Sequence, residues 1–167
     1  MHIKYVKSEK PAKFIINWKL LVSKYDLYFL YPSITIVYIS PPMSEKMLKF
    51  VEIGQQNPPK RDKNSRKEDF NEIYSEFIRG KANEQSSRCS QCGVPFCQVH
   101  CPLSNNIPDW LKLTAEVRYE EAYQLSQSTN NMPEVCGRIC PQDRLCEGNC
   151  VIEQSGHGTV TIGSIEK

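Results

Sequence analysis

The sequence predicts a small all-α domain, and three observations support this prediction. Apolar side chains recur at helical spacing in three segments between residues 67 and 128. Residues 43–167 contain no convincing alternation of apolar and polar residues, which is the pattern of a half-buried strand. All eight cysteines lie between Cys89 and Cys150. We therefore expect short helices wrapped around whatever these cysteines hold.

The first predicted helix occupies residues 67–79. Its apolar side chains have the i, i+3, i+4, i+7, i+8 spacing of one buried face: Phe70, Ile73, Tyr74, Phe77 and Ile78. Glu68 and Asp69 suit the positive end of the helix dipole, and Gly80 supplies the stop. We therefore expect these aromatic side chains to lie in the core.

Two further helices are predicted between the two cysteine groups. Asn105 or Asn106 can cap the first, with Pro108 in the first turn, where the missing N–H of proline costs nothing. The inner face of that helix carries Ile107, Trp110, Leu111 and Val117. The second helix runs from about residue 120 to residue 128 and ends at the Asn-Asn-Met-Pro segment of residues 130–133. Its inward residues are Ala122 and Leu125.

Residues 1–42 differ in composition from the rest of the chain. They contain six Lys, two acidic residues, no Gly and no Cys, whereas residues 43–167 carry a net charge of −2. The uncharged run of residues 27–44 is shorter than a membrane helix and contains three prolines, which disfavours a membrane anchor. Our hypothesis is that residues 1–42 are an irregular extension translated from upstream DNA and that the true start is Met43. Residues 43–66 then form a polar N-terminal arm.

The cysteines form two groups whose spacing distinguishes between three chemistries. The groups read Cys89-x2-Cys92-x4-Cys97-x3-Cys101-Pro102 and Cys136-x3-Cys140-Pro141-x4-Cys146-x3-Cys150. Structural zinc commonly uses paired C-x2-C knuckles, and only one such pair is present. Disulfides need an oxidising compartment, which no secretion signal supports. Iron–sulfur clusters fit best, because a Cys-Pro pair supplies the fourth cysteine of the bacterial ferredoxin run, which ligates the other cluster.

The same logic divides the cysteines into two ligand sets. The first cluster takes Cys89, Cys92, Cys97 and Cys150, and the second takes Cys101, Cys140 and Cys146. The second cluster then needs a fourth ligand, for which Cys136 is the candidate by spacing. The alternative is that Cys136 is a small buried hydrophobic residue.

Other residues near the cysteines have alternative interpretations. His100 and His157 could ligate iron, although eight cysteines leave little demand for them. Arg88, Arg138 and Arg144 either donate hydrogen bonds to sulfur or face solvent or a partner, and we favour the second interpretation. Motifs typical of substrate chemistry are absent from the sequence: it has no dinucleotide-binding or phosphate-loop motif and no Ser/His/Asp or paired-carboxylate arrangement. The chain is therefore expected to carry electrons and not to transform a substrate. Its net charge of +2 gives no reason to expect a nucleic-acid partner.

Residues 43–167 resemble the N-terminal iron–sulfur domain of the glutamate synthase (NADPH) small (β) subunit and the related domain of dihydropyrimidine dehydrogenase. The resemblance rests on Arg88-Cys-Ser-Gln-Cys-Gly93, Ile107-Pro-Asp-Trp110 and the second cysteine group, Cys136 to Cys150. It implies an α-helical ferredoxin-like fold with two 4Fe–4S clusters in residues 67–167. It also implies that Glu166 is the fourth ligand of the second cluster, which we prefer to Cys136.

The resemblance further implies a cytoplasmic electron relay. In the family, NADPH reduces an FAD, and the clusters pass electrons to the large (α) subunit, which makes glutamate from 2-oxoglutarate and glutamine. This chain stops at Lys167, before the family's FAD and NADPH domains begin, so we expect a fragment that needs a flavoprotein half and is not catalytic alone. Two alternatives stay open: a zinc-binding structural or docking protein, and the same module serving another flavoprotein of this type.

Overall fold

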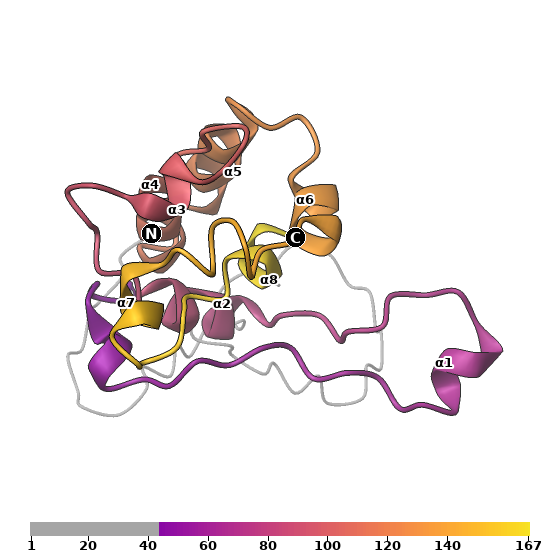
Figure 1. The fold of residues 1–167 in the computed structure, drawn as a ribbon. Coiled ribbons are helices and arrows are strands. Elements are labelled where there is room, and N and C mark those ends of the chain that lie inside the picture. Colours follow the sequence, from indigo (N-terminus) through magenta and orange to yellow (C-terminus); the bar gives the residue numbers. More distant parts are fainter. Residues whose placement is uncertain (1–43) are drawn as a thin grey trace, which may run out of the picture. The chain divides into compact units, whose positions relative to one another are not determined.

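The computed structural model describes residues 44–167, which form short helices joined by turns and loops (Figure 1). In chain order the elements are the 3-10 helix η2 (Lys49–Val51) and the α-helices α1 (Ser65–Glu68), α2 (Arg79–Ser86), α3 (Phe96–Val99), α4 (Ile107–Ala115), α5 (Tyr119–Gln127), α6 (Pro133–Ile139), α7 (Val151–Gln154) and α8 (Ile162–Glu166). Within these residues the sole β pairing is one antiparallel bridge between Lys60 and Tyr74. The prediction of an all-α domain is therefore confirmed for the described part of the chain.

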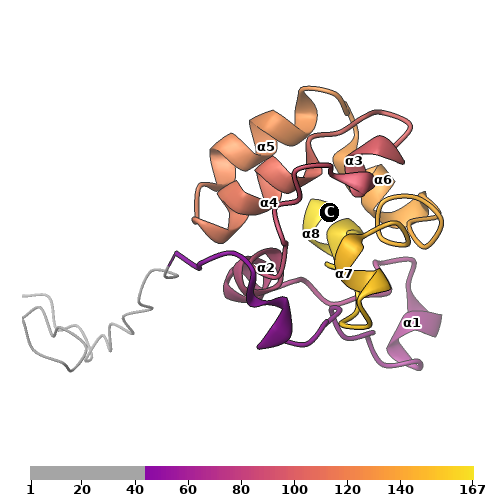
Figure 2. The same cartoon turned by 60° about the vertical axis from the view of Figure 1, so that its left-hand side comes forward.

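The predicted pair of helices between the cysteine groups is present as α4 and α5, which lie side by side, while α6 lies against α8 (Figure 2). Ile107, Trp110 and Leu111 of α4 are buried, as the spacing predicted, and they form the core with Ile152 and Ile162 from the C-terminal segments. Burying each such side chain contributes about 1.5–3 kcal/mol. The core thus joins the middle of the described chain to its C-terminal segments.

The ends of α4 differ in detail from the prediction. Asn106 precedes the helix, but its side chain makes no capping hydrogen bond. The Asn105 side chain instead makes two hydrogen bonds beside the core. Its Oδ1 accepts one from Trp110 Nε1 at 2.8 Å, and its Nδ2 donates one to the Ser126 carbonyl at 3.0 Å. Val117 lies two residues beyond the end of α4 and has a positive φ of 67°, so the predicted inner face ends at Ala115.

The predicted helix of residues 67–79 is wrong. Helix α1 ends at Glu68, α2 begins only at Arg79, and Gly80 lies inside α2. The intervening segment is held by main-chain bonds to the arm, from Arg61 N to Ile73 O at 2.8 Å and from Ser75 N to Pro59 O at 2.9 Å. These long-range partners replace the i→i−4 bonds that a helix would make, so the apolar periodicity does not describe a buried face. Phe70 and Ile78 are exposed.

The N-terminal arm therefore has a structural partner. Figure 1 shows α1 at the far end of two extended segments that run side by side. Arg61 fixes the turn because its guanidinium donates to both carboxylate oxygens of Asp69, at 3.0 and 2.6 Å. Such bidentate pairs are geometrically specific. Most of the arm is exposed as predicted, with Pro58 buried.

Two sequence predictions fall outside the described residues: the extension of residues 1–42 and the start at Met43. Among the residues that the structure describes, no helix has both the length and the apolar character needed to cross a membrane.

Candidate functional site

Four cysteines from distant parts of the sequence form the first group. Cys89 follows α2, Cys92 lies in the next loop, Cys97 lies within α3, and Cys150 immediately precedes α7. Burial, together with the neighbouring thiols of Cys89, Cys150 and Cys92, raises the pKa of the Cys97 thiol to about 12. Burial likewise raises the pKa of Cys89 to about 11, again with contributions from Cys150 and Cys92. Mutual electrostatic influence of this kind indicates that the four thiols are neighbours.

The remaining four cysteines line one cavity of about 240 Å³. They come from the loop after α3, from α6 and from the loop that follows it: Cys101, Cys136, Cys140 and Cys146. Glu166, near the end of α8, lines the same cavity. Both candidates for the fourth ligand, Cys136 and Glu166, therefore lie beside the three predicted cysteines.

The acidic groups around this cavity favour their neutral forms. Burial raises the pKa of Glu166 to about 7, and a hydrogen bond from Asn130 Nδ2 to its Oε1, 3.1 Å long, opposes that shift. Burial, the neighbouring Cys136, Glu166 and Cys101 together raise the pKa of Cys140 to about 11. Burial also raises the pKa of Cys146. A bound cation would displace these protons and supply the charge that the buried anions lack.

The donor set fits iron–sulfur clusters. All eight cysteines are free thiols. Around a cluster each ligand bonds a different iron, whereas the ligands of a single ion converge on one point. Among residues 44–167, no three Cys, His, Asp or Glu side chains are arranged to hold a single metal ion. The cavity of about 240 Å³ is many times the roughly 10–15 Å³ that one water needs, so it has room for a multi-atom group.

Two polar residues that contact the first group of cysteines, Gln91 and Ser90, were not predicted from the sequence. Gln91 has a positive φ of 51°, and its main-chain N and side-chain Nε2 lie 3.5 and 3.4 Å from Cys89 Sγ. Its Nε2 also donates to the Pro108 carbonyl at 2.7 Å, which fixes the side chain against α4. Ser90 Oγ lies 3.0 Å from Cys92 Sγ. The only feature of the sequence that could have indicated these contacts is that both residues between Cys89 and Cys92 are polar.

The structure corrects the interpretation of the arginines. Arg88, expected to face solvent or a partner, is completely buried, and its side chain donates to carbonyl oxygens and not to sulfur. Arg138 is half-buried with its guanidinium 5.0 Å from the Tyr74 ring centre. Arg144 is exposed as expected.

Neither histidine joins the two groups. His100 is exposed, with its Nδ1 2.9 Å from the Phe96 carbonyl oxygen, and His157 is exposed with its ring edge-on to Phe50 at 5.4 Å. These contacts support the interpretation that His100 and His157 are not ligands.

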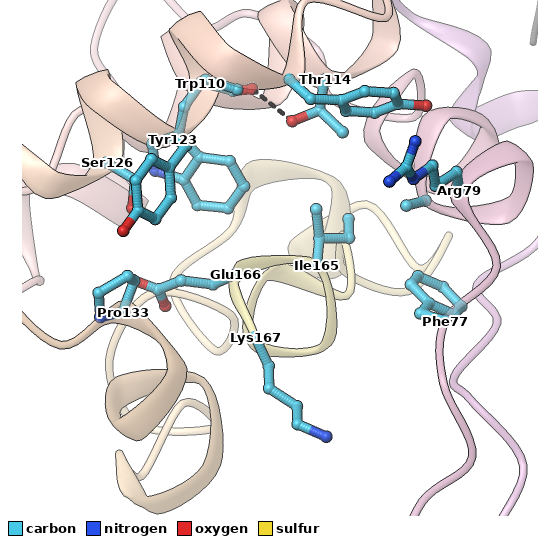
Figure 3. A pocket seen from close by; sticks show the side chains of 13 residues that line it. Phe77, Arg79, Trp110, Thr114, Tyr123, Ser126, Pro133, Ile165, Glu166 and Lys167 are labelled. Carbon is cyan, nitrogen blue, oxygen red and sulfur yellow. Dashed lines mark hydrogen bonds between the residues drawn. The ribbon is translucent and has the colours of Figure 1, made fainter.

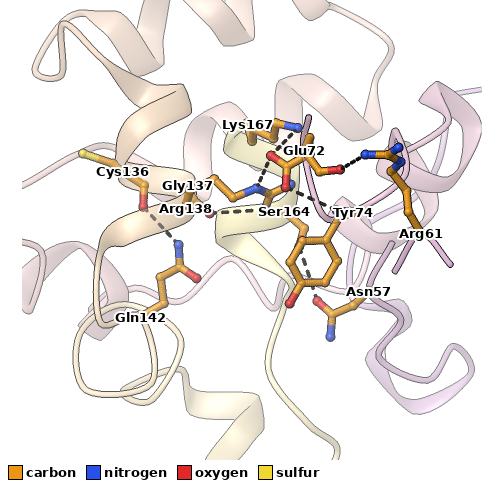
Figure 4. A network of polar contacts seen from close by, with 10 residues as sticks. All are labelled: Asn57, Arg61, Glu72, Tyr74, Cys136, Gly137, Arg138, Gln142, Ser164 and Lys167. Atoms are coloured by element: carbon orange, nitrogen blue, oxygen red, sulfur yellow. Dashed lines mark hydrogen bonds and ion pairs between the residues drawn. The ribbon is translucent and has the colours of Figure 1, made fainter. Parts of the chain in front are cut away.

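A polar network connects the segment of residues 69–78, and through it Arg61 of the N-terminal arm, to the helices that carry Cys136 and Glu166 (Figure 4). Glu72 Oε2 lies 3.0 Å from Arg138 Nε of α6 and 2.9 Å from Lys167 Nζ, the residue after α8. These two cations, with Lys167 contributing most, lower the pKa of Glu72 to about 2. Gln142 adds a bond from its Nε2 to the Cys136 carbonyl at 3.1 Å.

A second cavity, of about 270 Å³, adjoins the cysteine-lined one through Glu166. Figure 3 shows Tyr123 and Ser126 of α5 on one side of this cavity and Pro133 and Glu166 on the other. Trp110 of α4 contributes to the wall. Glu166 therefore borders both cavities.

Comparison with known proteins identifies this arrangement. Residues 66–167 match the family model for dihydropyrimidine dehydrogenase domain II, 4Fe–4S cluster. The chain is 70% identical over 124 residues to the glutamate synthase [NADPH] small chain of Azospirillum brasilense, which covers 74% of this chain and 26% of that one. It is 50% identical over 125 residues to the small chain of Escherichia coli (strain K12), covering 75% and 26%, respectively. It is 37% identical over 127 residues to the small chain of Bacillus subtilis (strain 168), covering 71% and 25%.

The chain spans about a quarter of the length of these relatives. The family match covers the two cysteine groups and the helices around them, including α8 with Glu166. The chain therefore belongs to the family of 4Fe–4S domains that includes domain II of dihydropyrimidine dehydrogenase.

Proposed function

We propose that this chain is a two-cluster electron-transfer module. Its helical domain, residues 67–167, holds the first 4Fe–4S cluster through Cys89, Cys92, Cys97 and Cys150. It holds the second through Cys101, Cys140, Cys146 and Glu166, with Cys136 as the alternative to Glu166. Each cluster, when bound, supplies a one-electron carrier. Residues 43–66 are the polar arm that leads into this domain.

The observation that carries the proposal is the separation of the eight cysteines into two groups, each with one buried cysteine and three partly buried ones. Cys89, Cys97 and Cys150 influence one another electrostatically, whereas Cys101, Cys140 and Cys146 line the cavity of about 240 Å³. The first group offers four thiols, and the second offers three thiols with either Glu166 or Cys136, so each group can supply the four ligands of one cluster. Partial burial limits the access of water to the sulfurs, and donors such as Gln91 near Cys89 stabilise thiolate charge.

We further propose that the module works within a glutamate synthase-like oxidoreductase. The relatives named above are glutamate synthase [NADPH] small chains. By analogy, electrons come from NADPH through FAD in a flavoprotein half. They leave to the large (α) subunit, where 2-oxoglutarate and glutamine give glutamate. A cytoplasmic location suits thiolate ligands, because that compartment keeps thiols reduced.

Anaerobic purification with metal analysis tests this proposal. We expect a brown protein with about eight irons and a similar amount of acid-labile sulfide per chain, and two electron paramagnetic resonance (EPR) signals after reduction by dithionite. A colourless protein with stoichiometric zinc would overturn the proposal in favour of a structural or docking role. About four irons with one signal would overturn the two-cluster assignment.

A further inference from the structure

The most deeply buried charged side chain in the described structure is Arg88, which directly precedes the first cysteine ligand. Its exposed fraction is 0%. Its Nε donates to the Ile53 carbonyl at 2.8 Å, and its Nη2 donates to the carbonyls of His157 and Gly158 at 2.7 and 2.8 Å. Its Nη1 donates to the Thr159 carbonyl. Main-chain oxygens from two distant segments therefore satisfy its donors.

These carbonyls do not neutralise its charge. None of the ion pairs formed by residues 44–167 includes Arg88. A buried charge is normally paired with an opposite charge or placed beside a metal site, because an isolated one is strongly penalised. A guanidinium stays protonated even when buried, since its intrinsic pKa is above 12. An anion near Arg88 would therefore reduce the free-energy cost of burying its charge.

The anionic candidates around Arg88 include cysteines of the first group. Burial lowers the pKa of Arg88, and two groups oppose that shift, Cys150 first and Glu153 second. Glu153 is exposed, so solvent screens its charge. Cys150 and Cys89, the direct neighbour of Arg88 in sequence, are both in the proposed ligand set of the first cluster. Their thiolates carry charge when that cluster is bound.

We propose that Arg88 is the buried counter-ion of the first cluster and raises its reduction potential. The inference rests on the proposed function, because it assumes that Cys89, Cys92, Cys97 and Cys150 hold a cluster. Four thiolates give such a cluster a net negative charge, and one-electron reduction adds a further negative charge. A fixed positive charge in a water-poor interior therefore stabilises the reduced form more than the oxidised form.

The size of the effect follows from Coulomb's law. Unit charges roughly 10 Å apart in an effective dielectric of about 20 change an equilibrium constant by about tenfold. For one-electron reduction, a tenfold change corresponds to about 59 mV. A purely structural role for Arg88, in tying Ile53 to the loop of residues 157–159, would instead change stability and leave this potential unaltered.

The test is a redox titration of the anaerobic holoprotein followed by EPR. Arg88→Gln removes the charge and keeps side-chain donors, and we expect the reduction constant of the first cluster to fall about tenfold, with the second cluster much less affected. Arg144→Gln is the matched control, because Arg144 is exposed and lies between Cys140 and Cys146, two proposed ligands of the second cluster. This variant should change the reduction constant of each cluster by less than about twofold. An Arg88→Gln protein with full iron and an unchanged first-cluster constant would overturn the proposal.

Arg88→Lys keeps the inference testable if the glutamine variant does not retain iron. Lysine preserves the charge but not the planar fork, so the reduction constant should stay within about twofold of the wild-type value. A tenfold fall in spite of the retained charge would overturn the counter-ion role. The wild-type protein separates this result from failure of the proposed function, because its iron content and two EPR signals are measured before any variant is compared.

Discussion

Replacement of Glu72 by Gln should weaken the attachment of the segment of residues 69–78 to α6 and to the residue after α8. The carboxylate pairs with Arg138 and Lys167 at 3.0 and 2.9 Å, and these partners lower its pKa to about 2. Against an unfolded value of about 4.3, the shift corresponds to at most about 3 kcal/mol. The side chain is one-third exposed, so solvent screening reduces the expected loss to about 1 kcal/mol.

The sign of the pH dependence follows from the lowered pKa of Glu72. The stabilisation is fully present above the unfolded pKa of about 4.3 and is lost as the pH falls through about 2. Between pH 5 and pH 8 the difference between wild type and Glu72→Gln should therefore be constant. A loss of about 1 kcal/mol corresponds to a melting temperature lower by about 4 °C for a domain of this size.

Thermal unfolding of the anaerobic holoprotein, followed by circular dichroism, measures this difference. Glu76→Gln is the matched control, because Glu76 is exposed in the same segment and makes no ion pair within residues 44–167. The control should melt within about 1 °C of wild type. If Glu72→Gln melts with the control, or if the difference changes strongly between pH 5 and pH 8, the argument from this network is refuted.

Further variants test the fourth ligand, the core and the corrected helix. Glu166→Ala should alter the EPR signal of the second cluster while Cys136→Ala preserves it, and the reverse result would make Cys136 the ligand. Leu111→Ala should destabilise the holoprotein by about 2–5 kcal/mol in chemical denaturation, because Leu111 is 1% exposed at the centre of the core. Phe70→Ser should change stability by less than about 0.5 kcal/mol, whereas a buried helical face would require several times more. Removal of iron by a chelator should abolish most of the helical circular dichroism, and a helical apoprotein would contradict the linkage of folding to metal binding.

The sequence predicted the α4–α5 pair because both helices are long enough to show apolar periodicity. Helices α3, α7 and α8 have four or five residues, too few for a 3.6-residue period to stand out. The segment of residues 69–78 has the periodicity but not the helix, because its main chain bonds to the arm. A local pattern cannot reveal a partner that lies 12 or more residues away.

The candidate site, like the fold, could be predicted from the sequence only in part. Cysteine spacing predicts two ligand sets, because a Cys-Pro pair is a local signal of a ligand that binds the other cluster. The burial of Arg88 was not predictable, because its acceptors are main-chain carbonyls of residues 53 and 157–159, which any sequence provides. The choice between Cys136 and Glu166 also depends on the fold, which brings α6 and α8 to the same cavity.

The proposed ligand sets also explain how such short helices can form a stable domain. Each set joins the segment of residues 89–101 to the segment of residues 140–150, so the two clusters would close the chain around α4 and α5. Without iron, the raised pKa values of Cys89 and Cys97 keep these thiols neutral, and no metal cluster joins the two cysteine segments. Cluster binding would replace the protons with iron and add its free energy to that of the small core. Loss of ligands from either segment should therefore affect both clusters, because each cluster draws on both segments.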